Sequence, residues 1–171
     1  RGLVGNIYRG KVSRVLPGMQ AAFVDIGLEK AAFLHASDIV IHNEVVGEVS
    51  TSHIEKHDIR DLVRDGQDIV VQVVKDPIGT KGARLTTDIT IPSRYLVFMP
   101  SVTHVGVSQR IEDEAERERL KELVSAFCDE DGGFILRTAA EGVSHPEVAA
   151  DADFLRRLWS KIQQRLKRRK S

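Results

Sequence analysis

Two extended segments joined by a tight turn open this 171-residue chain and limit what it can fold into. Residues 3–15 place apolar side chains among polar ones, and residues 20–27 continue in the same way. Pro17 and Gly18 lie between the two segments and form a turn signal. Because the connection is short, we expect the segments to pair as an antiparallel hairpin. A hairpin alone is only marginally stable in water, so further strands must cover its apolar face.

Later segments of the same region supply those strands. Apolar runs that indicate a third, a fourth and a fifth strand lie at residues 30–36, 67–75 and 84–87. An irregular stretch at residues 38–60, with a short helix near 58–64, separates the third strand from the fourth. Five strands with a long third-to-fourth connection are typical of a small OB-type barrel. We therefore expect such a barrel over residues 1–88.

A second, mixed unit follows the expected barrel. Strands are predicted at residues 95–99, 105–108 and 134–139, and helices at residues 112–127 and from Pro146 to about Lys170. The first helix alternates Glu and Arg on its outer face, which predicts solvent-exposed i,i+4 pairs. The fold class expected for the whole chain is α+β.

Aromatic side chains on the predicted strands are candidates for stacking on nucleic-acid bases. Val24 and Ile26 alternate with Phe23 and Asp25, so we expect Phe23 on the solvent face beside a charged residue. The phase of Phe33 in its own strand is undetermined. The competing interpretation places both rings in the barrel core.

Three cationic features accompany these aromatics. Lys75 and Lys81 lie near the fourth and fifth strands, and the glycines around Lys81 allow a backbone to approach a phosphate closely. Arg137 and Thr138 combine a planar guanidinium with a hydroxyl at a strand end, a pairing suited to phosphate oxygens. The alternatives are a solvated turn lysine and an arginine paired with an acidic neighbour.

Composition excludes several classes of protein. The formal net charge is zero, yet residues 151–171 carry eight basic and two acidic side chains, which either bind an anion or complement the dipole of a helix end. No run of about 18 apolar residues indicates a membrane span.

The cysteine and histidine content excludes two further kinds of site. The single Cys128 precludes an internal disulfide. The pair His53 and His57 has metal-compatible spacing but lacks a third ligand. The chain begins without Met and closes within a charged helix, so we expect a piece of a longer protein.

Several motifs together resemble the ribonuclease E/G family of bacterial endoribonucleases, with its ribonuclease G branch nearer than ribonuclease E. The motifs are Gly5-Asn6-Ile7-Tyr8-Arg9-Gly10, Ala21-Ala22-Phe23-Val24-Asp25-Ile26-Gly27, Lys81-Gly82-Ala83-Arg84-Leu85-Thr86-Thr87, Tyr95-Leu96-Val97-Phe98-Met99-Pro100, Ser108-Gln109-Arg110-Ile111-Glu112 and Arg137-Thr138-Ala139. The resemblance implies an S1 RNA-binding domain over residues 1–88, a 5′-sensor subdomain over residues 89–160 and a basic helical tail over residues 161–171 that leads to an RNase H-like part.

The resemblance also implies roles for individual residues. Ser93 and Gln109 stand where ribonuclease E has a glycine and an arginine, so a phosphate contact at Gln109 is not carried over. RNA would contact Phe23, Phe33 and Lys81, assisted by Lys75, while a 5′-monophosphate would bind Arg137 and Thr138 beside the backbone of Val97, with Arg110 as a further candidate.

The implied activity is magnesium-dependent cleavage of single-stranded RNA in rRNA and tRNA maturation and mRNA decay, in the cytoplasm. The magnesium carboxylates and the cysteines that bind zinc between protomers belong to later parts of such enzymes. We therefore expect this chain to bind RNA without cutting it, to hold no metal or other cofactor, to contact no membrane, and to belong to a homo-oligomeric parent. Two other hypotheses remain at this stage: a stand-alone S1 module without nuclease activity, and an oligomer-assembly element.

Overall fold

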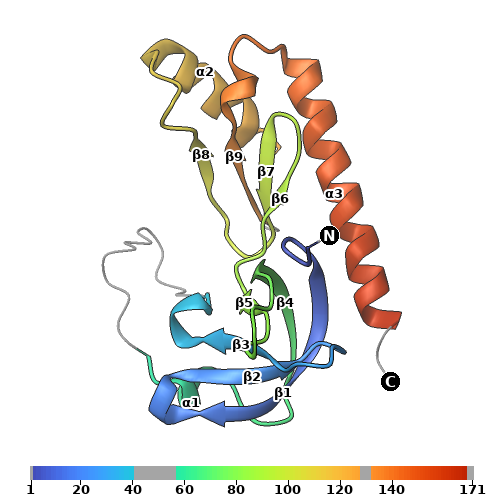
Figure 1. Ribbon diagram of the computed structural model, residues 1–171. Coiled ribbons are helices and arrows are strands. Elements are labelled where there is room, and N and C mark those ends of the chain that lie inside the picture. The colour runs from blue at the N-terminus through green and yellow to red at the C-terminus, as the bar shows by residue number, and fades with distance from the viewer. Residues whose placement is uncertain (1, 41–56, 128–131, 169–171) are drawn as a thin grey trace. The chain divides into compact units, whose positions relative to one another are not determined.

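The computed structural model describes residues 2–40, 57–127 and 132–168. The chain divides into two compact units, Arg1–Asp88 and Ile89–Ser171 (Figure 1). Each unit has its own sheet and its own core.

The first unit is a closed five-stranded barrel. Its strands follow one another around the barrel in the order β1-β2-β3-β5-β4, and every neighbouring pair is antiparallel except the parallel pair β3–β5. The predicted OB-type barrel is therefore confirmed. The elements are β1 (Ile7–Leu16), β2 (Ala21–Asp25), β3 (Ala32–His35), the short helix α1 (Ile59–Leu62), β4 (Asp68–Lys75) and β5 (Arg84–Thr86).

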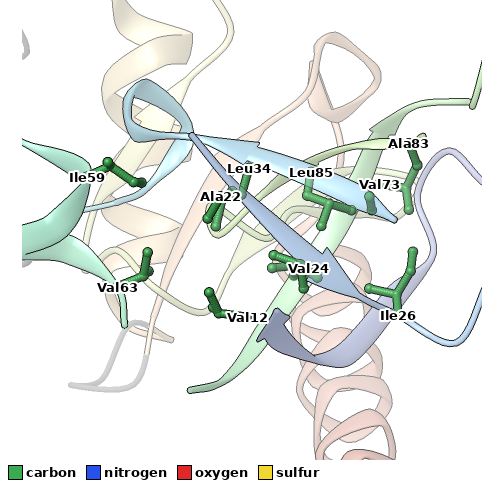
Figure 2. Packing of buried hydrophobic residues seen from close by; sticks show 12 residues of the cluster. Val12, Ala22, Val24, Ile26, Leu34, Ile59, Val63, Val73, Ala83 and Leu85 are labelled. Carbon is green, nitrogen blue, oxygen red and sulfur yellow. The ribbon is translucent and has the colours of Figure 1, made fainter. Parts of the chain in front are cut away.

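Alternate residues of these strands fill the barrel. Val24, Leu34 and Leu85 come from three different strands and each is completely buried (Figure 2). Ile59 of α1 closes the cluster from one side and is also fully buried. The side chain of Asp58 caps this helix by accepting a hydrogen bond from the amide of Arg60 at 2.9 Å. The core therefore fixes which side chains of each strand face outward.

The second unit is an α+β arrangement around a four-stranded sheet of order β6-β7-β9-β8. Neighbouring strands are antiparallel except for the parallel pair β8–β9. Helix α3 runs beside β7, and α2 packs on β8 and β9 (Figure 1). The elements are β6 (Ile91–Pro92), β7 (Leu96–Met99), β8 (Val105–Val107), α2 (Glu114–Ser125), β9 (Gly133–Leu136) and α3 (His145–Arg168).

Two phenylalanines form the centre of the second core. Phe98 of β7 and Phe134 of β9 are buried, and their ring centroids lie 5.2 Å apart. The guanidinium of Arg156, from α3, lies 5.7 Å and 5.3 Å from these two centroids and donates to the carbonyl of Phe127 at 2.9 Å. Such stacking lets an arginine lie against apolar surface while keeping a hydrogen-bond partner. The α+β class predicted for the chain is confirmed.

The structure differs from the predicted elements at several boundaries. The first strand begins at Ile7 instead of residue 3, because Asn6 donates to the carbonyl of Leu3 at 2.9 Å and closes a turn. The strand predicted to reach residue 139 ends at Leu136, because a 3₁₀ turn spans Thr138–Ala140. His53, Cys128 and most of the 38–60 segment lie outside the described residues. Within the described part of the chain, no helix is long and apolar enough to cross a membrane.

Candidate functional site

The strand register of the barrel brings five side chains into one row across its outer surface. Phe23 of β2 pairs with Phe33 of β3, and Phe33 pairs in turn with Arg84 of β5. At one end of the row Arg14 of β1 pairs with Phe23, and at the other end Lys75 of β4 pairs with Arg84. We call these five residues, one from each strand, the barrel row. Two adjacent aromatics are thus flanked by cations on both sides.

The two aromatics of the barrel row face outward. Phe23 is 36% exposed, whereas its neighbours Ala22 and Val24 are fully buried. Phe33 is half-buried between the buried Ala32 and Leu34. Its ring meets that of His35 edge to face, with 5.4 Å between centroids. Phe23 is therefore on the predicted face, and the undetermined phase of Phe33 is settled by its pairing with Phe23.

The cations of the barrel row differ in how they are balanced. Arg84 is held by Asp38, with 3.0 Å between Nε and Oδ2. Arg14 and Lys75 are exposed, and neither has a carboxylate within salt-bridge distance among the described residues. Both lie just after a register shift in their strands, which turns an extra residue outward. The row therefore carries, at each end, a positive charge that no carboxylate of the described residues pairs with.

A turn that contains Lys81 packs against the start of β3. Lys81 and Ile78 exchange two backbone hydrogen bonds, at 2.9 Å and 3.1 Å, and the amide of Phe33 donates to the carbonyl of Ala83. Gly82 lies so close to this segment that a Cβ there would overlap the Ala31 carbonyl oxygen. The turn that carries the predicted Lys81 is thereby held against the start of β3, the strand that contributes Phe33 to the row.

Lys30 is a further cation at this turn that the sequence analysis did not identify. Its Nζ donates to the carbonyl of Gly79, so the lysine reaches across from the segment before β3. In the sequence Lys30 follows Gly27-Leu28-Glu29 and has the pattern of an ordinary surface loop. Only the packing of the two segments shows that Lys30 reaches the turn that contains Lys81.

A second cationic position lies at the end of the second sheet. Arg137 directly follows β9 and is exposed. Its Nη1 donates to the carbonyl of Ser93 at 2.6 Å, and its amide donates to the carbonyl of Tyr95 at 2.8 Å. No carboxylate among the described residues lies within salt-bridge distance of this guanidinium. Arg137 is thus oriented by a neutral carbonyl, and no carboxylate of the described residues neutralises its positive charge.

The other residues predicted for this position gather around the same strand. Thr138 follows Arg137 at the start of the 3₁₀ turn and is exposed. Val97 pairs with Ile135, two residues before Arg137, and is half-buried. Arg110 lies in a turn whose first residue, Ser108, donates to the carbonyl of Leu136 at 2.8 Å. The fold therefore brings Val97, Arg110, Arg137 and Thr138 to one region of the second sheet, and the barrel row belongs to the other unit.

Charged side chains of α2 hold the two turns on either side of Arg137. Arg117 donates to the carbonyls of Ser108 and Ile111 at 2.7 Å and 2.9 Å. Glu116 accepts from the amide of Gly142 at 2.6 Å. The sequence predicts solvent-exposed i,i+4 pairs for this helix. Glu116 and Arg117 differ from that prediction, because both are half-buried and both bind backbone groups of the flanking turns.

Glu116 also forms a two-fold contact with Arg119. Arg119 donates to the two carboxylate oxygens at 2.6 Å and 2.9 Å and to the carbonyl of Val143 at 3.1 Å. These hydrogen bonds from Arg119, followed by the one from the Gly142 amide, lower the pKa of Glu116 from 4.5 to about 2. The turn after Arg137 is thus anchored by a carboxylate that stays ionised at all ordinary pH values.

Two family models match this chain and together cover most of it. The model of the S1 RNA binding domain matches residues 3–80, and the model of the ribonuclease E/G family matches residues 90–171. The matches fall on either side of the boundary between the two structural units.

Relatives with assigned names resemble the chain over almost all of its length. Ribonuclease G of Escherichia coli strain K12 is 69% identical over 168 residues, which are 98% of this chain and 34% of that protein. Ribonuclease G of Haemophilus influenzae is 69% identical over 96% of this chain and 34% of that protein. Ribonuclease E of Nostoc sp. strain PCC 7120 is 40% identical over 94% of this chain and 22% of that protein. The chain thus spans about a third of the length of the ribonuclease G relatives.

The anchoring of the turn by Glu116 predicts a pH dependence. Because the folded-state pKa is depressed, the contact titrates near pH 2 in the folded chain, and the stability that it contributes is complete above about pH 4.5 and is lost as the pH falls towards about 2. We expect the amide proton resonance of Gly142 to move with an apparent pKa near 2 in an NMR titration, and to lose this transition in Glu116→Gln. Glu118→Gln, an exposed change on the same helix, should leave it in place. A Gly142 transition near 4.5 in the wild type would contradict the contact.

Proposed function

Because this chain belongs to the ribonuclease E/G family, we propose that it is the RNA-binding and 5′-monophosphate-sensing portion of an endoribonuclease. The parent cleaves single-stranded RNA in rRNA maturation and mRNA decay. Residues 1–88 serve as its S1 domain and residues 89–160 as its 5′ sensor. The barrel row is the single observation that supports this proposal most strongly. Its aromatic and cationic side chains give the S1 unit a surface that complements the bases and phosphates of single-stranded RNA.

The barrel row binds RNA by stacking and by charge. Phe23 and Phe33 lie side by side on neighbouring strands and offer π-faces to successive bases, a contact that tolerates any base sequence. Arg14 and Lys75 at the two ends pair with no carboxylate of the described residues, and they neutralise backbone phosphates. Lys81, in the turn that Lys30 also contacts, extends the positive surface near the start of β3.

The second unit reads the 5′ end of the RNA. A terminal monophosphate is bound by the guanidinium of Arg137 and the hydroxyl of Thr138, with the backbone of Val97 lining the site and Arg110 as a further phosphate contact. Arg137 suits this role because its hydrogen bond to the Ser93 carbonyl orients the fork without neutralising it. A triphosphate would crowd such a site and leave charge unpaired, which disfavours it relative to a monophosphate.

Hydrolysis belongs to the remainder of the parent. Among the described residues, no group of three or more His, Cys, Asp or Glu could hold a metal ion. We place the magnesium ligands, and the cysteines that share zinc between protomers, in parts of the parent beyond this chain. The parent acts as a homo-oligomer in the cytoplasm, and this chain contributes substrate binding without catalysis.

The contribution of Phe23 can be measured directly. We expect Phe23→Ala to weaken the binding of a short single-stranded RNA by about 1–3 kcal/mol, regardless of its 5′ group, because one stacking platform is lost. Phe154→Ala is the matched control, since Phe154 is 50% exposed on α3 and lies outside the site. Fluorescence anisotropy at fixed salt gives both affinities. Equal affinities of the two variants would argue against the barrel row as the RNA surface.

The 5′-sensing role rests on Arg137. The wild type should bind a 5′-monophosphate RNA more tightly than the same RNA with a 5′-hydroxyl. Arg137→Ala should remove this difference, because the charged donor to the terminal phosphate is gone. Arg157→Ala, which deletes an equally charged and exposed side chain on α3, should preserve it. A preference that survives in Arg137→Ala would place the sensor elsewhere.

A further inference from the structure

The half-buried carboxylate of Asp151, on α3, holds the turn between β6 and β7. Asp151 accepts hydrogen bonds from the hydroxyl of Ser93 at 2.5 Å and from the amides of Tyr95 and Leu96 at 2.9 Å and 3.1 Å. Strand β6 ends at Pro92, so among the described residues no strand carbonyl pairs with the amides of Tyr95 and Leu96 at the start of β7. The carboxylate takes the place of the missing strand and satisfies both amides.

The opposite side of the same hairpin receives Arg137. The carbonyl of Ser93 accepts from Nη1 of Arg137 at 2.6 Å, and the carbonyl of Tyr95 accepts from the amide of Arg137 at 2.8 Å. The hairpin is closed internally by the amide of Ser93, which donates to the carbonyl of Leu96 at 2.7 Å. A turn of four residues therefore lies between the carboxylate of Asp151 and the guanidinium of Arg137.

We propose that Asp151 is a positioning residue for Arg137 and sets the selectivity of the chain for a 5′-phosphate. This inference rests on the proposed function and names a residue outside the predicted phosphate contacts. Asp151 fixes the Ser93 carbonyl, and that carbonyl holds the guanidinium in one orientation before the ligand arrives. Ordering a long side chain in advance reduces the entropy that phosphate binding must overcome.

The arrangement also keeps the two opposite charges from neutralising each other. Among the described residues, Asp151 accepts hydrogen bonds from a hydroxyl and two amides, and the Arg137 guanidinium donates to a neutral carbonyl. A direct ion pair would orient Arg137 equally well, but it would compete with a phosphate for the same donors. Because Asp151 acts on Arg137 through the neutral backbone of this turn, the guanidinium is oriented and its positive charge stays available to a phosphate.

Asp153 supplies a matched control on the same helix. Its carboxylate is 68% exposed and pairs with Arg157, at 3.3 Å between Oδ2 and Nε. Asp153→Asn therefore removes the same charge two residues away without touching the hairpin. Ser93→Ala is a milder test, because it removes one hydrogen bond to Asp151 while keeping the carbonyl that Arg137 uses.

The experiment compares the dissociation constants of one single-stranded RNA with a 5′-monophosphate and with a 5′-hydroxyl, at fixed salt, for each 171-residue variant. We expect Asp151→Asn to reduce the ratio of the two constants roughly tenfold, towards that of Arg137→Ala, and to leave binding of the 5′-hydroxyl RNA unchanged. Asp153→Asn should keep the wild-type ratio, and Ser93→Ala should fall between. A folded Asp151→Asn chain with the wild-type ratio overturns the inference.

A second measurement makes the result independent of RNA. In the wild type the Ser93 contact should slow rotation of the Arg137 guanidinium and separate its Nη resonances in NMR spectra, and in Ser93→Ala and Asp151→Asn the separation should diminish. An unchanged Arg137 signal overturns the positioning role. If the wild type lacks any 5′ preference but Arg137 responds as expected, the proposed sensor function fails while the positioning contact stands. If Asp151→Asn does not fold, Ser93→Ala decides both measurements.

Discussion

The strand register of the closed barrel is the constraint on which the first unit depends. Each strand must turn one set of alternate residues inward, and the fully buried Val12, Val24 and Leu34 leave no freedom in that choice. A shift of one residue in β2 would exchange Phe23 for Val24 at the surface and place a large ring where the core holds a smaller side chain. The same register that packs the core therefore produces the row of aromatic and cationic side chains outside.

The distribution of partners among the cations separates structural from binding roles. Arg84 is paired with Asp38, and Arg117 donates to backbone carbonyls, so both contribute to the fold. Arg14, Lys75 and Arg137 have no carboxylate partner within the described part of the chain, and all three are exposed. Positive charge without an internal partner is what an anionic ligand needs, and it occurs in both units. The proposed binding of RNA rests on this difference between the cations that pair within the fold and the exposed cations that do not.

The sequence predicted local features well and distant contacts poorly. Alternation around Val24 and Ile26 was sufficient to place Phe23 outside, because a strand in a barrel has only two faces. The same reasoning gives no clear phase for Phe33, and its pairing with Phe23 decides which face it occupies. Glu116 and Asp151 carried no recognisable signal, because each binds backbone amides more than 20 residues away. Such contacts depend on tertiary packing, which periodicity does not encode.

The central claim is that the barrel row binds the RNA strand and that Arg137 and Thr138 bind its 5′ phosphate. The most direct test is an NMR titration of the isotope-labelled chain with one short single-stranded RNA, with and without the 5′-monophosphate. We expect both RNAs to shift the backbone amides of the barrel row, and only the phosphorylated RNA to shift those of Arg137 and Thr138. Identical maps for the two RNAs, or a barrel row that neither RNA perturbs, would contradict the account.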